Sequence, residues 1–266
     1  MGGRWFLARV PHAHTSMLLT RTVNSFCNAL LSLVYPQACS LCGDSVEDRC
    51  LGVACAQCWR ETRIFTNTEI TCWKCGALSL GTIVTEKRDQ VRCRRCDGDA
   101  FTAARACGAY EGALRASVLA LKREPYLSQH LVTLLAKIQE RPPLDKATRV
   151  IPVPLHPDRE KARGFNQAAV ISRELARAVR LPFDEVSLIR TVHSERHRAG
   201  MDARGRRETV AEAFSVRYPR LIEDERVLVV DDVFTTGATV SACAAALIAA
   251  GAKEVFVLTI ARPVNY

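Results

Sequence analysis

Residues 229–239 carry side chains whose types and spacing suit ligand chemistry. The segment reads Val-Val-Asp-Asp-Val-Phe-Thr-Thr-Gly-Ala-Thr and follows an apolar run that begins at Arg226. Asp231 and Asp232 come directly after that run, and a Thr/Gly turn then leads into an alanine-rich stretch. Open α/β sheets bind their ligands outside such strand ends. The segment therefore predicts a ligand site where a buried strand gives way to a helix.

Each part of this segment suits one part of a sugar phosphate. The N-terminus of the expected helix offers free backbone N–H groups and a positive dipole end, which bind phosphate. The three threonines add hydroxyl donors, and Gly237 lets the backbone bend sharply and approach closely. The carboxylates of Asp231 and Asp232 suit the vicinal hydroxyls of a ribose, directly or through Mg²⁺. The alternative, an ordinary threonine helix cap, does not account for two aspartates after a buried strand.

Cysteines carry the second chemical signal. Eight of the 12 cysteines form Cys-x-x-Cys pairs, all within 58 residues. The pairs are Cys39/Cys42, Cys55/Cys58, Cys72/Cys75 and Cys93/Cys96. A two-residue spacing lets a tight turn aim both sulfurs at one metal, so the four pairs predict two structural zinc sites. Full cysteine ligation leaves no position for a reacting water, and the metal is expected to supply much of the module's folding energy.

The zinc ligands can be grouped in more than one way. Sequential pairing is the simpler arrangement, with the first two pairs on one zinc and the last two on the other. Interleaved pairing and Cys50 as a substitute ligand stay open. Cys27, Cys107 and Cys243 have no Cys-x-x-Cys partner, and we expect them to be small core residues.

The cysteines also divide the chain into modules. Eleven of the 12 fall within residues 1–107. We expect an N-terminal extension in residues 1–35, with a short amphipathic helix at 23–34. A double zinc ribbon is expected in residues 36–107, and an α/β domain in residues 108–266.

Length and composition set the class of protein. The 266 residues are 48% hydrophobic and 24% charged, the usual balance of a globular chain. A run of about 18 apolar residues, which would predict a membrane span, is absent from the sequence. The first residues lack a regular signal-peptide layout, so we expect a cytoplasmic protein with reduced cysteines. The formal charge of +9 favours a polyanionic partner, whether nucleic acid, acidic membrane or phosphate-rich small molecule.

Apolar periodicity predicts the elements that position these groups. Helices are expected at 113–122, 129–139, 165–180 and about 238–249. Strands are expected at 149–154, 213–216, 226–231 and 254–260. The last strand, helix and strand form a right-handed unit, which requires a parallel sheet. The continuous apolar run before Asp231 is typical of a parallel strand that is buried on both faces.

The segment around Asp231 resembles the phosphoribosyl pyrophosphate signature of type I phosphoribosyltransferases. With residues 163–167 (Arg-Gly-Phe-Asn-Gln), the preceding strand and the cysteine pairs, the chain from about Cys39 resembles the ComF family. That family comprises double-zinc-ribbon, phosphoribosyltransferase-like proteins linked to natural competence and DNA uptake. Lys122 matches the family's helix lysine, and residues 258–262 match its last strand. The resemblance implies a type I phosphoribosyltransferase fold that follows a double zinc ribbon.

The resemblance also implies roles for individual residues. Asp231 and Asp232 would hold the ribose hydroxyls with Mg²⁺, and Lys122 would lie in the same site. The 5-phosphate would lie on the loop residues Thr235, Thr236, Gly237, Ala238 and Thr239. Residues 154–163 would form a pyrophosphate loop with charge-assisted donors, unless their charges are simply solvated. The basic residues of that loop are Arg159, Lys161 and Arg163. Asn166 and Gln167 would orient the loop or cap the next helix.

Residues 190–207 depart from the family pattern. They hold six arginines and two histidines. The family usually has a glutamine near His197 and an asparagine where Glu208-Thr209 stands here. If this stretch is the hood over the pyrophosphate, the change affects turnover more than binding. His193 and His197 are candidate proton donors, although exposed loop histidines usually have no such role.

Two functions follow from the resemblance. The first is binding of phosphoribosyl pyrophosphate or a related sugar phosphate by a protein that serves DNA uptake through single-stranded DNA handling. DNA-uptake machinery proteins are candidate partners for the zinc ribbons. The alternative is an active phosphoribosyltransferase that moves the phosphoribosyl group to a nitrogen acceptor. The sequence shows no obvious general base and does not identify the acceptor.

Overall fold

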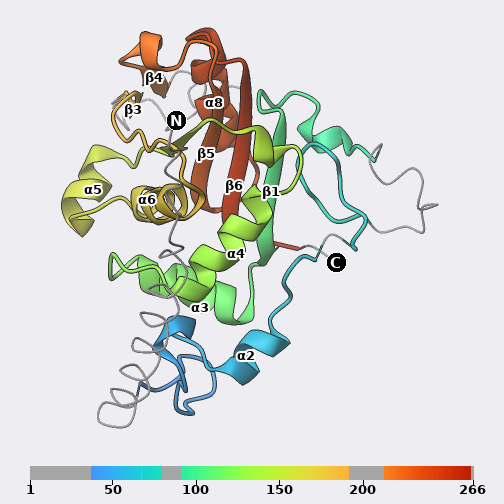
Figure 1. Cartoon of the computed structure of the whole chain (residues 1–266), viewed down its shortest axis with the longest axis vertical. Coiled ribbons are helices and arrows are strands. Elements are labelled where there is room, and N and C mark those ends of the chain that lie inside the picture. Colours follow the sequence, from blue (N-terminus) through green and yellow to red (C-terminus); the bar gives the residue numbers. More distant parts are fainter. Residues whose placement is uncertain (1–36, 67, 80–90, 192–212, 265–266) are drawn as a thin grey trace, which may run out of the picture.

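A four-stranded parallel sheet in the order β1-β6-β5-β2 lies at the centre of the molecule (Figure 1). The computed structural model describes residues 37–66, 68–79, 91–191 and 213–264. The strands are β1 (Ala103–Ala109), β2 (Arg149–Pro152), β5 (Arg226–Val233) and β6 (Glu254–Arg262). Every neighbouring pair runs parallel, which confirms the expected α/β class.

The two central strands, β5 and β6, are buried on both faces. Residues 227–230 and 255–258 are fully buried, and the register pairs Leu228 with Phe256 and Val230 with Leu258. Apolar side chains on both sides of the pleat require cover on both sides. The register also places Asp231 opposite Thr259, so the carboxyl ends of both strands meet at one edge of the sheet.

Helices cover the two faces, and residues that alternate along β5 pack against different helices. Leu228 and Val230 pack in one core, whereas Val227 and Val229 pack in the other. The first core is covered by α3 (Gly112–Leu121), α4 (Gln129–Gln139) and α6 (Gln167–Val179). The second is covered by α8 (Ala238–Ala249) and the antiparallel pair β3 (Leu188–Arg190) and β4 (Phe214–Val216). The four expected helices are thus confirmed, with small shifts of their ends.

The cysteine modules join different cores. Short elements shape them: η1 (Arg49–Leu51), α2 (Ala56–Glu61) and η3 (Arg94–Cys96). Cys39, Cys55 and Cys58 belong to the core under α3 and α4. Cys72, Cys75 and Cys96 belong to the core under α8. The first cysteine module therefore packs against α3 and α4, and the second joins the core on the other side of the sheet. Two further 3-10 turns are η4 (Leu144–Lys146) and η6 (Pro219–Leu221).

Strand β1 was not expected from the sequence. Its residues, Ala-Ala-Arg-Ala-Cys-Gly-Ala, include no β-branched or aromatic side chain, so local propensity gives no strand signal. Pairing with β6 from Ala103 to Ala109 makes this segment an edge strand of the main sheet. The strand crosses the boundary expected at residues 107 and 108, and that boundary stays a prediction.

Residues 154–163, for which the resemblance implies a pyrophosphate loop, are mostly helical, and their role in binding pyrophosphate stays a prediction. Helix α5 spans Pro157–Arg163. Pro157 stands in its first turn and Gly164 ends it with a left-handed φ of 79°. Proline at a helix start and glycine after its end are ordinary helix signals. The expectation of a loop, which rests on the family resemblance, does not take these two helix signals into account.

Several expectations lie outside the described residues. These are the extension with its helix at 23–34, Cys27, and the candidate hood with His193, His197 and Glu208-Thr209. Cys107 and Cys243 are fully buried, as expected for small core residues. Among the helices that the structure describes, none is long and apolar enough to cross a membrane.

Candidate phosphate site and cysteine clusters

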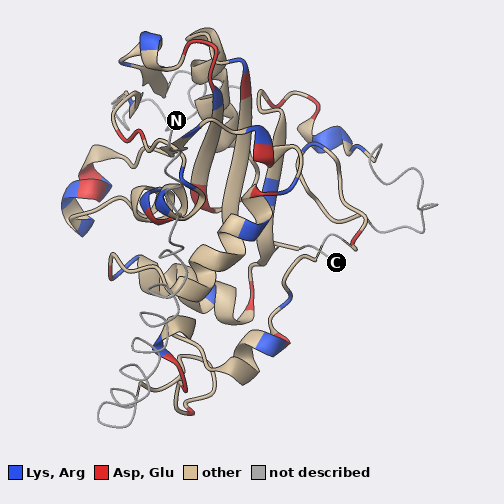
Figure 2. Ribbon diagram, viewed as in Figure 1, with Lys and Arg blue, Asp and Glu red and all other residues tan. Residues whose placement is uncertain are grey.

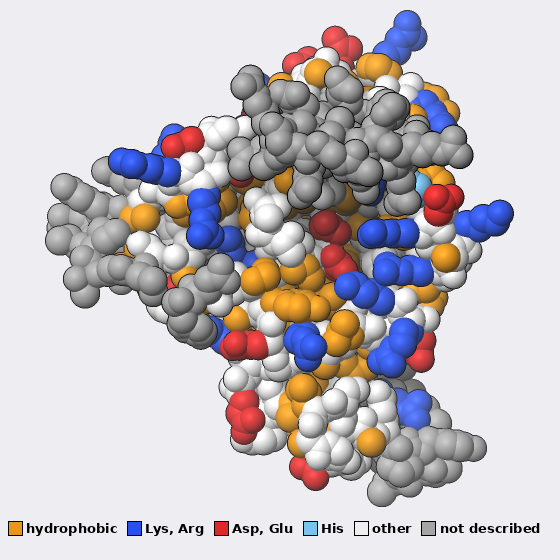
Figure 3. Space-filling view, turned by 180° about the vertical axis from the view of Figure 1, so that it is seen from behind, with side chains coloured by type: hydrophobic (Ala, Val, Ile, Leu, Met, Phe, Trp, Pro, Cys, Tyr) orange, Lys and Arg blue, Asp and Glu red, His pale blue; other side chains and the backbone are white. Residues whose placement is uncertain are grey.

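The two aspartates stand at the carboxyl end of β5. The backbone N–H of Asp232 donates a hydrogen bond of 2.8 Å to Oδ1 of Asp231. Lys122, which ends α3, places Nζ 3.9 Å from Oδ2 of Asp232. The structure therefore brings the helix lysine to the acidic pair, as the resemblance implied. Figure 3 shows acidic side chains near the middle of the face opposite to that of Figure 1, with Lys and Arg side chains beside them.

The carboxyl group of Asp231 is electrostatically unfavourable in its charged form. Burial, together with the negative charge of Asp232, raises the pKa of Asp231 to about 7. The N–H of Asp232 and the charge of Lys122 act in the opposite direction and do not offset the burial. A cation or a hydroxyl donor at this position would supply the missing stabilisation of the carboxylate.

The turn after β5 leaves the N-terminus of α8 open. Gly237 is the N-cap residue and provides no side-chain cap, while Thr236 Oγ1 accepts a 3.3 Å hydrogen bond from the N–H of Ala238. Thr235 and Thr239 are exposed and border a small hollow of about 60 Å³ together with Asp231. A helix start whose N-cap residue has no side chain, beside exposed threonine hydroxyls, suits a phosphate group. An ordinary threonine cap at the N-cap position is not what the structure shows.

Glycine is required at position 237. Its φ is 83°, and an added Cβ would lie 2.8 Å from Cζ of Phe234. The Phe234 ring packs edge-on against Phe101, with 5.9 Å between centroids. The guanidinium of Arg262, at the carboxyl end of β6, lies 5.0 Å from the centroid of the Phe234 ring. Phe101, Phe234 and Arg262 thus pack beside the turn at residues 235–239, which we call the phosphate loop after its proposed ligand.

Arg262 links this loop to the second cysteine cluster, a role that the sequence did not reveal. Its side chain is buried, and Nη1 donates a hydrogen bond to the carbonyl oxygen of Cys75. At the start of α8, the hydroxyl of Ser241 accepts a 3.0 Å hydrogen bond from the N–H of Ala100. The only signal in the sequence was an arginine at the end of an otherwise apolar strand.

The eight cysteines form two groups of four, in sequential order. Cys39, Cys42, Cys55 and Cys58 make the first group, and Cys72, Cys75, Cys93 and Cys96 the second. In each group all four sulfurs lie within 4.8 Å of one another. Between sulfurs of different Cys-x-x-Cys pairs, the shortest distance is 3.7 Å in the first group and 3.4 Å in the second.

These distances fit zinc. Four sulfurs at about 2.3 Å from one zinc lie about 3.8 Å apart in a tetrahedron. Sequential pairing is therefore confirmed over interleaved pairing, and Cys50 belongs to neither group. Burial opposes ionisation of Cys39, but hydrogen bonds from backbone N–H groups, including those of Cys42 and Cys55, lower its pKa to about 6. The first group thus holds a thiol prepared to become a metal-binding thiolate.

The basic residues of α5 are not in contact with the phosphate loop. Arg159, Lys161 and Arg163 are exposed, and among the described contacts none joins them to the Asp pair or to residues 235–239. Figure 2 shows α5 at the edge of the molecule, with both basic and acidic residues along its ribbon. Arg163 Nη1 instead donates a 2.7 Å hydrogen bond to Gln167 Oε1.

Asn166 both caps a helix and orients the segment before α5. Its Oδ1 accepts a 3.0 Å hydrogen bond from the N–H of Ala168, and its Nδ2 donates one of 3.0 Å to the carbonyl oxygen of Val153. The two roles that the sequence offered for Asn166 are thus filled at once.

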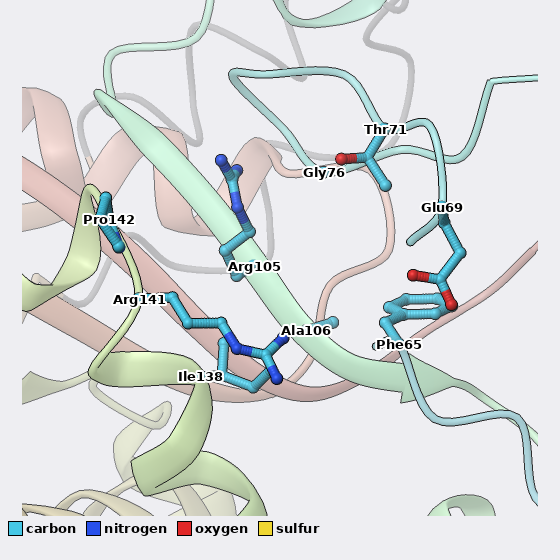
Figure 4. Close-up of a pocket in the computed structure, with 9 residues that line it drawn as sticks. All are labelled: Phe65, Glu69, Thr71, Gly76, Arg105, Ala106, Ile138, Arg141 and Pro142. Carbon is cyan, nitrogen blue, oxygen red and sulfur yellow. The ribbon is translucent and has the colours of Figure 1, made fainter. Parts of the chain in front are cut away.

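A second hollow lies between β1, the end of α4 and the loop that joins the cysteine groups. Figure 4 shows Arg105 directed toward Gly76 and Arg141 extended along the strand toward Ala106. Arg105 Nη1 donates hydrogen bonds to the carbonyl oxygens of Trp73 and Ala104. The hollow holds about 40 Å³, roughly the volume of one water. It is a packing seam and too small for a nucleotide.

Known proteins are similar to part of this chain. Residues 161–264 match the family model of the phosphoribosyl transferase domain. "Competence protein F" of Haemophilus influenzae is 36% identical over 114 residues, which cover 42% of this chain and 49% of that protein. "DNA utilization protein YhgH" of Escherichia coli O157:H7 is 34% identical over 114 residues, 43% of this chain and 49% of that protein. The resemblance to ComF-type proteins is confirmed.

The extent of these matches is limited. The chain spans about half the length of the curated relatives it matches. Among solved structures, the Bacillus subtilis glutamine phosphoribosylpyrophosphate amidotransferase complexed with ADP and GMP aligns with a TM-score of 0.37 and 21% identity. That alignment covers 53% of this chain and 30% of the other.

Metal analysis tests the cysteine groups. We expect about two zinc ions per chain by mass spectrometry of the purified protein, and about one in Cys96→Ser, because one group then lacks a ligand. Cys50→Ser, which alters a cysteine outside both groups, should keep two. A Cys96→Ser protein that retains both ions would contradict the assignment of the second group.

Asp231→Asn should stabilise the ligand-free protein, and the gain should grow from about pH 4 to about pH 7 and then level off. The folded-state pKa of about 7 lies above the reference value of 3.8, so the unfolded chain binds fewer protons in this window. Stability of the native protein therefore falls as pH rises, whereas asparagine has no charge to bury. We expect a gain on the order of 4 kcal/mol at pH 8 from denaturant melts, because each pKa unit corresponds to about 1.4 kcal/mol. The exposed Asp145→Asn should show no such trend, and an equal trend in both variants would contradict the pKa.

Proposed function

We propose that this protein binds phosphoribosyl pyrophosphate with Mg²⁺ and serves DNA uptake through the handling of single-stranded DNA. The observation that carries the proposal is the edge formed by β5 and α8. There Asp231 and Asp232 stand beside a helix start whose N-cap residue has no side chain, with exposed Thr235 and Thr239. The match of residues 161–264 to the phosphoribosyl transferase domain supports the same reading.

The chain's own groups would divide the ligand between them. The N–H groups of α8 and the threonine hydroxyls would bind the 5-phosphate, and the two carboxylates would orient the ribose hydroxyls. Asp231 and Asp232 are also the residues that would hold Mg²⁺, which neutralises pyrophosphate charge when bound. Because the pKa of Asp231 is raised to about 7, binding through its carboxylate weakens as pH falls below neutrality.

The DNA part of the proposal rests on the relatives and on charge. One relative is named for competence and another for DNA utilization, and the formal charge is +9. Partner proteins of the DNA-uptake machinery would dock on the cysteine modules. Zinc-binding cysteines must be reduced, and the cytoplasm keeps cysteines reduced, so a cytoplasmic location is consistent with the two cysteine groups.

Calorimetry with phosphoribosyl pyrophosphate and Mg²⁺ tests the pocket. Wild type should bind, and Asp231→Asn/Asp232→Asn should bind at least about a hundredfold more weakly, because two charged ligand contacts are lost. Asp145→Asn is the matched control and should bind as wild type does. Equal affinity of all three proteins would show that the Asp pair is not the site.

The enzymatic alternative has its own readout. Pyrophosphate release in the presence of a panel of nucleobases would show transfer of the phosphoribosyl group to a nitrogen acceptor. Binding without release for any acceptor would support ligand binding as the function of the pocket.

Single-stranded DNA should bind in a salt-dependent manner. We expect a mobility shift of oligo(dT) at low salt, with log affinity falling by about 0.7 per log unit of salt for each phosphate contact. A complex of unchanged affinity from low to high salt, or no complex at low salt, would remove the DNA part of the proposal.

A further inference from the structure

A third hollow opens between the second cysteine module and the phosphate loop. We call it the arginine groove and define it by Arg92, Arg95, Arg262 and Thr235, which line it. Its volume is about 410 Å³, against about 60 Å³ for the hollow at the phosphate loop. Ligand pockets usually hold roughly 300–1,000 Å³, so the arginine groove has the size of a ligand site.

The charge of the groove has one sign. Its described lining residues include three arginines and no aspartate or glutamate. Arg92 and Arg95 are exposed, and neither forms a salt bridge with a carboxylate in the described part of the chain. The Arg92 guanidinium lies 5.0 Å from the ring of Trp73, which holds it at the rim.

The cysteine cluster does not account for all of this charge. Four thiolates on one zinc carry a net charge of about −2. Two other guanidiniums already face the cluster, because Arg262 donates to the carbonyl oxygen of Cys75 and Arg105 donates to that of Trp73. Arg262 is buried and Arg105 is half-buried. Arg92 and Arg95 are therefore in excess of what the cluster needs.

We propose that the arginine groove is a second anion site, which binds the phosphates of a nucleotide or polyphosphate ligand through Arg92 and Arg95. Guanidinium groups bind phosphate by paired charge-assisted hydrogen bonds. Thr235 borders both the arginine groove and the hollow at the phosphate loop. A ligand in the groove would thus lie next to a 5-phosphate on the loop, and a strand of linked nucleotides could continue from one to the other.

The test uses two probes and two charge-matched variants of the full chain. The probes are inorganic tripolyphosphate, measured by calorimetry, and a dye-labelled oligo(dT) strand, measured by fluorescence anisotropy at low salt. Arg92→Gln/Arg95→Gln changes the groove. Arg217→Gln/Arg220→Gln removes the same charge from exposed positions between β4 and β5.

We expect the groove variant to bind at least one probe about tenfold more weakly than wild type, and the control variant to bind as wild type does. For oligo(dT), the slope of log affinity against log salt should also fall by about 1.4, two phosphate contacts at about 0.7 each. Loss of tripolyphosphate binding identifies a polyphosphate site, and loss confined to oligo(dT) identifies a nucleic-acid strand as the ligand. Unchanged affinity in the groove variant, or no binding of either probe by wild type, overturns the proposal.

Two controls separate this proposal from folding and from the proposed function. Because Cys93 lies between the two arginines, the groove variant is used only with two zinc ions and a wild-type melting curve. It should also bind phosphoribosyl pyrophosphate with Mg²⁺ as wild type does, since the Asp pair is unaltered. If that sugar phosphate binds to none of the proteins while the groove result holds, the proposed function fails and the second anion site remains.

Discussion

The structure depends on a sheet whose central strands are apolar on both faces. β5 and β6 leave no side of residues 227–230 or 255–258 to solvent, so each face needs its own cover. Three helices cover one face and α8 covers the other. Each cysteine group joins one of these cores, so the metal-binding modules are part of the cover. The polar residues after β5 are thereby confined to the carboxyl edge of the sheet, where open α/β sheets bind their ligands.

The second cysteine group has a closer relation to that edge than the first. It shares a core with α8 and with Phe234, and Arg262 joins the carbonyl oxygen of Cys75 to the Phe234 ring. The ring in turn excludes any side chain at Gly237. A contiguous set of contacts therefore runs from the second cysteine group to the turn that we propose binds a phosphate. The geometry of that turn depends on a module that lies far from it in the sequence.

The Asp pair shows a conflict between stability and binding. Burial and the negative charge of Asp232 raise the pKa of Asp231 to about 7, a shift of the kind that functional sites commonly show. Lys122 lies 3.9 Å from Asp232 and offsets only part of the repulsion. Sites that bind ligands commonly keep such unfavourable groups, because the ligand removes the penalty when it binds.

The sequence by itself determined the local features. Helical periodicity located α3, α4, α6 and α8, the apolar run located β5, and the two-residue cysteine spacing identified the metal-binding groups, because each of these signals lies within a few residues. It also placed the Asp pair and the threonine turn at a strand end. It had no signal for β1, whose alanine-rich segment becomes a strand only by pairing with β6. The family pattern did not indicate the helix within 154–163, which proline begins and glycine ends.

Tertiary structure decided what these local features touch. It grouped the cysteines sequentially, set Lys122 beside Asp232, and brought Arg262, Phe234 and Gly237 together from separate segments. It also placed Arg92 and Arg95 along a groove that reaches Thr235. The physical reason is that spacing along the chain fixes only which side chains share a turn or a face. Which faces meet is decided by the need to bury both sides of one sheet.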